Sequence, residues 1–277
     1  MLDAHTELAI PPETYFGAAI EAFQRGGAES AVEVIVQSQE WGDYNLSADE
    51  FARRVENRHP TGMGDVMRVF YQFYAERQGK PRWGSKNLAF ITRMTSVYQL
   101  LPEARFVHII RDGRDVALSA IPVWFGPNTV AESATRWERA LRAARRQAQD
   151  LPFYTEITYE DLVLDTSTAL KRLCHFIEVD WEPSMLDYHL HSAQRLSAEF
   201  TDRRRQGRII PKRARLEIHR LVGHPPQPDR VQRWRREMSA ADLRTFESIA
   251  GETLEEFGYE LSESEPGQRP GSTHDVR

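Results

Sequence analysis

The 277-residue sequence has a single cysteine, Cys174, and no apolar run close to the about 18 residues that a membrane-spanning helix needs. One cysteine excludes an intramolecular disulfide, which fits a reducing compartment. No signal-peptide pattern occurs among the first residues. We therefore expect a cytoplasmic protein that has no membrane partner.

Acidic residues outnumber basic residues over the chain as a whole, with 41 Asp and Glu against 36 Lys and Arg. The net charge is −5, which argues against general nucleic-acid binding, so we expect no nucleic-acid partner. Hydrophobic residues make up 40% of the sequence, enough to bury a core in a chain of this length. We expect one domain over residues 1–261, followed by a disordered tail over 262–277, a segment poor in apolar residues.

Two familiar patterns of site chemistry are missing. His189 and His191 lack the spacing that places two ligands on one helix face, and no cysteine accompanies them, so we predict no metal. No G-x-x-x-x-G-K-[ST] loop occurs, which disfavours a nucleotide kinase.

The most informative stretch that is present reads RFVHIIRDGRDVALS. Residues 106–110 form a short apolar run typical of a buried strand, residues 111–115 form a charged turn, and helix-forming residues follow from Val116. Ligands bind where strands end in an open α/β sheet, and a helix N-terminus favours phosphate. Arg111, Arg114 and Ser119 are therefore candidate phosphate ligands. Arg114 could instead pair with Asp112, Asp115 or an acid on a helix.

Strand patterns alternate with helix patterns through the middle of the chain, which predicts an α/β fold whose parallel sheet has right-handed crossovers. The predicted helices lie at 64–78, 88–101, 131–149 and 167–178, and the predicted strands at 106–110 and 153–158. Residues 15–57 look helical with breaks at 26–27 and 43–45. Ser47, followed three residues later by Glu50, forms a capping box.

Five stretches occur in the order found in one family. They are PPETYF (11–16), GKPRWGSKN (79–87), RFVHIIRDGRDVALS (105–119), YEDLV (159–163) and RVQRWRREMSAADL (230–243). On these, the chain resembles the sulfotransferases that use 3′-phosphoadenosine 5′-phosphosulfate, and most of all the bacterial branch related to the tyrosylprotein enzymes. The resemblance runs from residue 1 to about residue 261. It implies the P-loop NTPase-like sulfotransferase fold, with helices flanking a parallel sheet.

The resemblance assigns a 3′-phosphate site. Arg111 and Ser119 match the family's ligands for this group, and the planar guanidinium suits a phosphate. Arg230 and Arg233 match the C-terminal segment that folds over the nucleotide in relatives. That segment commonly reads S-V-G-R-W-R. The serine and glycine are absent here, which puts in doubt any part the serine plays in stabilising the transferring group.

The resemblance also assigns two catalytic residues. Glu13 matches the family's base, which takes the proton from the acceptor hydroxyl. Lys86 matches a lysine that neutralises charge on the bridging oxygen. Relatives often read K-T-P at this position, whereas this chain reads Lys86-Asn87-Leu88. The alternatives are a helix N-terminal acid for Glu13 and a solvated lysine for Lys86.

One family element is not found in the sequence. Relatives begin with a strand and a loop resembling P-R-S-G-T-T that binds the 5′-phosphosulfate, followed by a helix ending in a phrase like M-L-D-A-H. The first five residues of this chain match that phrase, so we expect the strand and loop upstream of Met1. Either the start codon lies further upstream or the gene is shortened and its product impaired.

A basic segment spans residues 203–236. It has 12 lysines and arginines against two acids, Glu217 and Asp229. It is either a basic lid over an anionic cofactor or acidic acceptor, or a solvated loop and helix face.

The sequence thus predicts a sulfotransferase that moves the sulfuryl group of 3′-phosphoadenosine 5′-phosphosulfate to a hydroxyl or amine on a small molecule or protein. The alternative is a non-catalytic remnant that binds a nucleotide or a partner. The acceptor and the oligomeric state are open.

Overall fold

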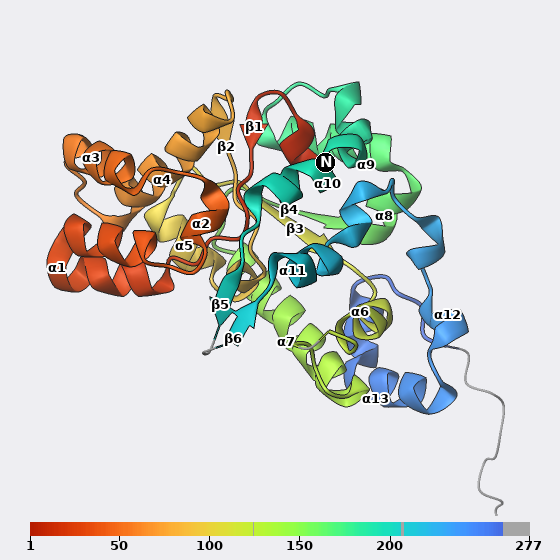
Figure 1. Cartoon of the computed structure of the whole chain (residues 1–277). Helices are drawn as coiled ribbons and strands as arrows, with labels where there is room; N and C mark the ends of the chain where they lie inside the picture. The colour runs from red at the N-terminus through yellow and green to blue at the C-terminus, as the bar shows by residue number, and fades with distance from the viewer. Residues whose placement is uncertain (124, 206–207, 263–277) are drawn as a thin grey trace, which may run out of the picture. The chain divides into compact units, whose positions relative to one another are not determined.

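The computed structural model describes residues 1–123, 125–205 and 208–262 (Figure 1). The chain divides into two compact units. The larger unit comprises residues 1–110 and 143–228, and the smaller unit comprises 111–142 and the segment from 229 onward. The disorder predicted for 262–277 falls, beyond Ser262, outside the described residues. In the part of the chain that is described, no helix is long and apolar enough to span a membrane.

Helices outnumber strands in both units. The α-helices are α1 (Gly17–Val36), α2 (Trp41–Tyr44), α3 (Ala48–Arg58), α4 (Met63–Arg77), α5 (Met94–Leu100), α6 (Gly113–Ala120), α7 (Val130–Ala148), α8 (Tyr159–Leu164), α9 (Thr166–Ile177), α10 (Tyr188–Glu199), α11 (Lys212–Ile218), α12 (Trp234–Glu237) and α13 (Ala240–Glu256). The 3₁₀ helices are Leu2–Ala4, Leu88–Thr92, Pro183–Asp187, Arg220–Gly223 and Pro228–Arg230. The strands are β1 (Leu8–Ala9), β2 (Arg82–Trp83), β3 (Phe106–Ile110), β4 (Tyr154–Thr158), β5 (Arg203–Arg205) and β6 (Arg208–Ile210).

Two of the three strand pairs in the described part of the larger unit are parallel, as the alternating pattern predicts. β3 pairs with β4 in a register that sets Phe106 opposite Tyr154, and β1 pairs with β2. The predicted strands at 106–110 and 153–158 are confirmed within a residue. A third pair, β5 with β6, is antiparallel and was not predicted.

The main core of the larger unit lies among α1, α3 and α4, which pack against one another (Figure 1). Phe70 on α4 is fully buried, and its ring meets those of Phe16, Tyr44 and Phe51 at centroid distances of 4.9–6.0 Å. Such edge-to-face contacts add to the burial of apolar area. The predicted break in α1 is real, because Gly27 has φ of 71°.

Only one of the two hydrogen bonds of the predicted capping box at Ser47 is formed. The Ser47 hydroxyl accepts a hydrogen bond from the Glu50 amide at 3.2 Å and so caps α3. The Glu50 carboxylate accepts from Arg54 at 2.9–3.0 Å. A helix-surface ion pair has therefore taken the place of the reciprocal bond.

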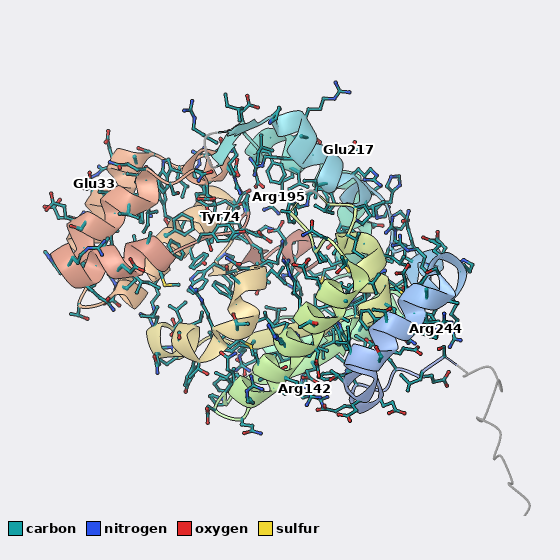
Figure 2. All side chains as sticks on the ribbon, turned by 90° about the horizontal axis from the view of Figure 1, so that it is seen from below. Glu33, Tyr74, Arg142, Arg195, Glu217 and Arg244 are labelled. Carbon is teal, nitrogen blue, oxygen red and sulfur yellow. The ribbon has the colours of Figure 1, made fainter. Side chains whose placement is uncertain are left out.

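The chain that follows β1 is fastened to the helices of the same unit. Arg195 on α10 donates to the Ile10 carbonyl at 2.8 Å and to the Tyr74 hydroxyl at 2.9 Å. Tyr74 in turn donates to Glu199 at 2.7 Å. Tyr74 and Arg195 are labelled near each other in Figure 2. These bonds hold Ile10 in place just before the segment that contains Glu13.

The smaller unit packs around Trp137 of α7. Its ring contacts Phe246 of α13, and its indole N–H donates to the Arg111 carbonyl at 3.0 Å. A Cβ atom added to Gly113 would lie 2.5 Å from the Phe246 ring and 2.6 Å from the Trp137 ring. The glycine of the RDGRD turn is therefore required by the close approach of two aromatic side chains.

We expect Gly113→Ala to lower the free energy of unfolding by about 1–3 kcal/mol, because buried rings must shift to admit the methyl group. Urea denaturation measures the change. Gly251→Ala on α13 is the matched control, since its Cβ would lie 3.8 Å from Leu261. This control should be stabilising by about 0.5–1 kcal/mol. Equal effects of the two substitutions would contradict the packing explanation.

Candidate functional site

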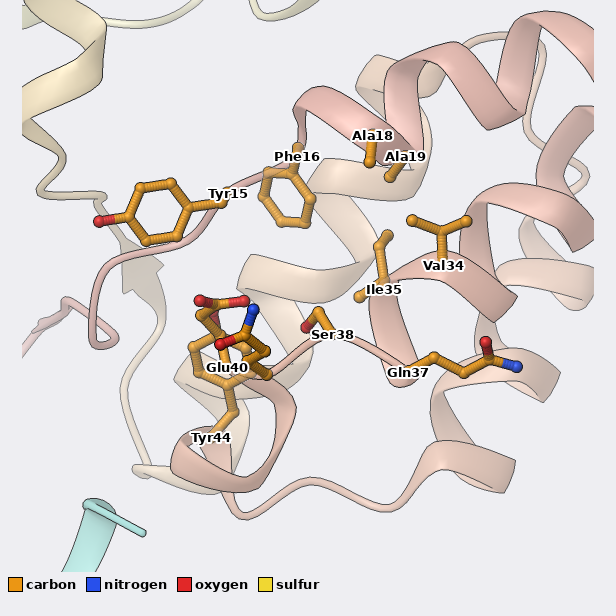
Figure 3. A pocket seen from close by; sticks show the side chains of 11 residues that line it. Tyr15, Phe16, Ala18, Ala19, Val34, Ile35, Gln37, Ser38, Glu40 and Tyr44 are labelled. Atoms are coloured by element: carbon orange, nitrogen blue, oxygen red, sulfur yellow. The ribbon is translucent and has the colours of Figure 1, made fainter. Parts of the chain in front are cut away.

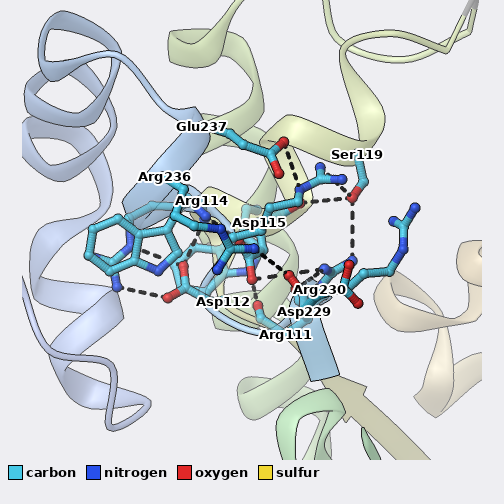
Figure 4. Close-up of polar contacts among 12 residues, drawn as sticks. Arg111, Asp112, Arg114, Asp115, Ser119, Asp229, Arg230, Arg236 and Glu237 are labelled. Carbon is cyan, nitrogen blue, oxygen red and sulfur yellow. Dashed lines mark hydrogen bonds and ion pairs between the residues drawn. The ribbon is translucent and has the colours of Figure 1, made fainter. Parts of the chain in front are cut away.

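Two clusters contain the residues singled out from the sequence, one in each unit. In the smaller unit, two guanidinium groups converge on one hydroxyl (Figure 4). Arg111 donates to the Ser119 Oγ at 3.3 Å and Arg233 at 3.4 Å. Arg111 also donates to the Arg230 carbonyl at 2.9 Å. The side chains of Arg111, Ser119 and Arg233 therefore meet here. Arg230, 119 residues from Arg111 in sequence, is joined to them through its backbone carbonyl.

Backbone contacts explain why these residues meet. Asp112 caps the N-terminus of α6 by accepting from the Arg114 amide at 2.9 Å, which starts the helix directly after Arg111. Asp115 accepts from the Trp234 amide at 2.8 Å, which joins α6 to α12. Ser119 lies one turn beyond Asp115 on the same helix. The turn and the C-terminal segment therefore form one cluster.

Arg114, the second arginine of the turn, does not belong to this cluster. It is 1% exposed and forms ion pairs with Asp112 and Glu247, each at 2.7 Å. Its guanidinium also stacks on the Trp234 ring at 3.6 Å from the centroid. Of the partners considered from the sequence, Asp112 is confirmed, and the role of Arg114 is structural.

Arg111 and Arg233 each have an acidic neighbour, and Arg111 lies 3.8 Å from the Asp115 carboxylate. Asp115 is fully buried, and this burial raises the pKa of its carboxyl against the opposing effects of the Trp234 amide and Arg111. Arg233 also contacts Glu237 at 3.3 Å, and that side chain is half exposed. A set of guanidinium donors and one hydroxyl matches the chemistry of a phosphate monoester. The chemistry of these residues therefore suits a phosphate group.

In the larger unit, Glu13 and Lys86 form an ion pair across 73 residues of sequence. The Tyr15 hydroxyl donates to the other Glu13 oxygen at 2.6 Å. Burial alone would raise the pKa of Glu13, but hydrogen bonds from Lys86 and Tyr15 outweigh it and hold the pKa below its ordinary value. Glu13 is thus an ionised carboxylate with a hydroxyl in hydrogen-bond reach, as a base requires.

The neighbours of Glu13 and Lys86 bring the pair together. Thr14 forms hydrogen bonds with Tyr71 at 2.7 Å and with Ser85 at 3.4 Å. Asn87 donates to the Thr14 carbonyl, and its side chain caps the 3₁₀ helix Leu88–Thr92 by accepting from the Ala89 amide. Asn87, which stands where relatives have threonine, therefore attaches the lysine segment to the glutamate segment.

Two residues near this pair escaped the sequence analysis. They are Tyr15 and His219, and no sequence pattern marks either as a site residue. Burial lowers the pKa of His219, nearby Lys86 lowers it further, and Glu13 opposes them. His219 follows the end of α11, and no local sequence pattern predicts that it lies near Lys86 and Glu13.

Part of the basic segment is internal. Arg215 and Arg203 both pair with Asp43 of α2, at 2.5 and 2.7 Å, and Asp43 is fully buried. The Arg215 guanidinium also stacks on Phe200. These two arginines form neither a lid over a cofactor nor a solvated surface, the two alternatives proposed for the basic segment. They join β5 and α11 to α2.

Within residues 1–123, 125–205 and 208–262, no group of three or more histidine, cysteine or acidic side chains is arranged to hold a metal ion.

A model of the sulfotransferase family matches residues 1–183. A protein-tyrosine sulfotransferase of Drosophila melanogaster is 24% identical over 115 residues, 39% of this chain and 23% of that protein. Protein-tyrosine sulfotransferase A of Caenorhabditis elegans is 26% identical over 106 residues, 35% of this chain and 28% of that protein. The aligned part thus spans about a quarter of the length of these curated relatives.

Solved structures agree at the level of the fold. The sulfotransferase domain from the Synechococcus PCC 7002 olefin synthase has a TM-score of 0.53 and 19% identity, covering 94% of this chain and 89% of that one. The sulfotransferase domain from the curacin biosynthetic pathway has a TM-score of 0.54 and 16% identity, covering 94% and 92%. The predicted α/β class and the motif-based resemblance are both confirmed. The chain belongs to the sulfotransferase family.

Proposed function

We propose that the chain transfers a sulfuryl group from 3′-phosphoadenosine 5′-phosphosulfate to a hydroxyl or amine acceptor. The acceptor oxygen or nitrogen bonds to sulfur, and the bond from sulfur to the bridging phosphate oxygen breaks. The acceptor proton passes to Glu13. Adenosine 3′,5′-bisphosphate leaves with the bonding electron pair on its 5′-phosphate oxygen, where Lys86 offsets the growing charge.

The observation that carries this proposal is the convergence of Arg111 and Arg233 on the Ser119 hydroxyl. Two partly buried guanidinium groups beside one hydroxyl form a set of donors that suits the oxygens of a phosphate group. A 3′-phosphate would take hydrogen bonds from both arginines. It would also take one from Ser119 once that hydroxyl turns away from the Asp115 carbonyl, to which it donates at 2.9 Å.

A second observation supports the chemistry at the acceptor. The ionised carboxylate of Glu13 contacts both a hydroxyl donor and the Lys86 ammonium. These are the groups needed to accept a proton and to stabilise a leaving oxygen. A cytoplasmic location, which rests on the single cysteine, stays a prediction.

Calorimetry with adenosine 3′,5′-bisphosphate tests the phosphate site. We expect Arg111→Ala to weaken binding about 10- to 150-fold, since a hydrogen bond to a charged group contributes about 1.5–3 kcal/mol. Arg111→Lys should recover only part of this, because it keeps the charge and loses the fork.

Arg244→Ala is the control, because Arg244 is an exposed arginine on α13 of the same unit. It should leave the affinity unchanged. Equal affinity of wild type and Arg111→Ala would refute the assignment. Binding without turnover of any acceptor would instead favour the non-catalytic alternative.

A further inference from the structure

A pocket lies beside the Glu13 segment in the larger unit. Its volume is about 270 Å³, and its walls come from both ends of α1 and from α2 (Figure 3). Its lining combines apolar and aromatic side chains with a polar segment between α1 and α2. The first group includes Phe16, Ala18, Ala19, Val34, Ile35 and Tyr44, and the second is Gln37, Ser38, Gln39 and Glu40. An apolar cavity of about 150 Å³ accommodates benzene, so this pocket has room for one ring with a short alkyl chain.

Two tyrosines connect the pocket to Glu13. Tyr15 lines the pocket at one edge (Figure 3), and its hydroxyl donates to the Glu13 carboxylate at 2.6 Å. Tyr44 lines the opposite wall and donates to the Glu13 carbonyl at 3.1 Å. Tyr15 is 50% exposed, so its ring can rotate toward solvent without breaking the core.

The Tyr15 phenol holds the position that an acceptor hydroxyl needs. It is an O–H group on an apolar ring, directed at the ionised carboxylate that also contacts Lys86. Burial, with the neighbouring Glu13 charge, raises the pKa of Tyr15 to about 12, so the phenol keeps its proton.

We propose that the acceptor is an uncharged phenol or alcohol on an apolar body, which fills this pocket and presents its hydroxyl to Glu13 in place of Tyr15. This inference rests on the proposed function and narrows its acceptor. Val34, Ile35, Ala18 and Ala19 offer no side-chain hydrogen bond, so we expect the apolar body of the acceptor against them. Rotation of Tyr15 joins the pocket to the base.

The first test measures binding of 4-propylphenol by calorimetry and is independent of turnover. We expect a Kd on the order of 0.1–1 mM for a ligand of this size. Ala18→Leu, at an exposed position of the lining, should weaken binding by at least about tenfold, since one methylene in an apolar pocket changes affinity by that amount or more. Gln24→Leu is the matched control, since it is exposed on α1 away from the pocket.

The second test separates displacement of Tyr15 from a role in orienting Glu13. Tyr15→Phe removes the competing hydroxyl, so the affinity for 4-propylphenol should rise about two- to tenfold, the worth of one hydrogen bond. Unchanged affinity together with a lower kcat would mean that Tyr15 only positions Glu13, and it would overturn the displacement step.

Acceptor preference completes the test. With 3′-phosphoadenosine 5′-phosphosulfate, 4-propylphenol should be turned over in preference to N-acetylglucosamine and to a tyrosine peptide flanked by aspartates. Preference for either competitor, or binding that Ala18→Leu does not weaken, overturns the inference. If the wild-type protein does not bind adenosine 3′,5′-bisphosphate, the proposed function is refuted. Binding of 4-propylphenol still tests, independently, whether the pocket accepts a phenol.

Discussion

Glu13→Gln should lower kcat about 10²- to 10⁴-fold, the usual contribution of a positioned general base. Glutamine keeps the shape of the side chain and an oxygen that can accept from Tyr15 or Lys86, but it cannot take the acceptor proton. Release of adenosine 3′,5′-bisphosphate from 3′-phosphoadenosine 5′-phosphosulfate, with 4-propylphenol as acceptor, measures the rate.

The pH dependence follows from the direction of the Glu13 shift. Lys86 and Tyr15 hold the pKa of Glu13 below its ordinary value despite burial. The wild-type rate should therefore persist at and above the ordinary glutamate pKa of about 4.3, and it should fall only as the pH drops through the lower pKa of the folded protein. Glu13→Gln should lack this acid-side decline.

Two comparisons separate catalysis from structure. Affinity for adenosine 3′,5′-bisphosphate should be the same in Glu13→Gln and wild type, because the nucleotide ligands lie on other residues. Glu21→Gln, at an exposed acid on α1, should leave kcat unchanged. An unaltered kcat in Glu13→Gln would remove this residue from the mechanism.

Asp43→Asn should lower the free energy of unfolding by about 3–5 kcal/mol, the effect of removing one partner from a buried ion pair. Asp43 is fully buried and accepts hydrogen bonds from Arg215, Arg203 and the Thr201 amide. Asparagine removes the counter-charge that Arg215 and Arg203 share, and Arg203 then keeps only Glu40, at 3.6 Å. Urea denaturation followed by circular dichroism measures the loss.

The same carboxylate makes stability depend on pH. Burial alone would raise the pKa of Asp43, but hydrogen bonds from Arg215, Thr201 and Arg203 outweigh it, so the pKa lies below its ordinary value. The stabilisation is complete above the pKa of an unfolded aspartate, about 3.9, and is lost as the pH falls through the lower folded pKa. Asp43→Asn should lack this acid-dependent loss.

Glu21→Gln is also the control for stability, because it breaks an ion pair with Arg25 in which both side chains are about 70% exposed. Such helix-surface pairs contribute only about 0.3–0.5 kcal/mol. A loss in Asp43→Asn as small as that of the control would mean that water reaches the arginines.

Local signals were sufficient for much of the fold. The apolar run at 106–110 and the periodicity at 64–78 each depend on a few consecutive residues, and β3 and α4 match them closely. The β5–β6 hairpin was missed for the opposite reason. Its arginine-rich strands carry no apolar alternation, and Arg203 is fixed by Asp43, 160 residues away in sequence.

The sequence by itself determined the sulfotransferase family, the parallel α/β class and the identity of the candidate residues, because motif order, periodicity and capping are written in short stretches of chain. Only the tertiary structure decided which candidates meet. Glu13 pairs with Lys86 because Thr14, Ser85 and Asn87 bond beside them, and Ser119 joins two arginines because Asp115 holds the Trp234 amide. Contacts of this kind depend on the packing of distant elements, which no local pattern encodes.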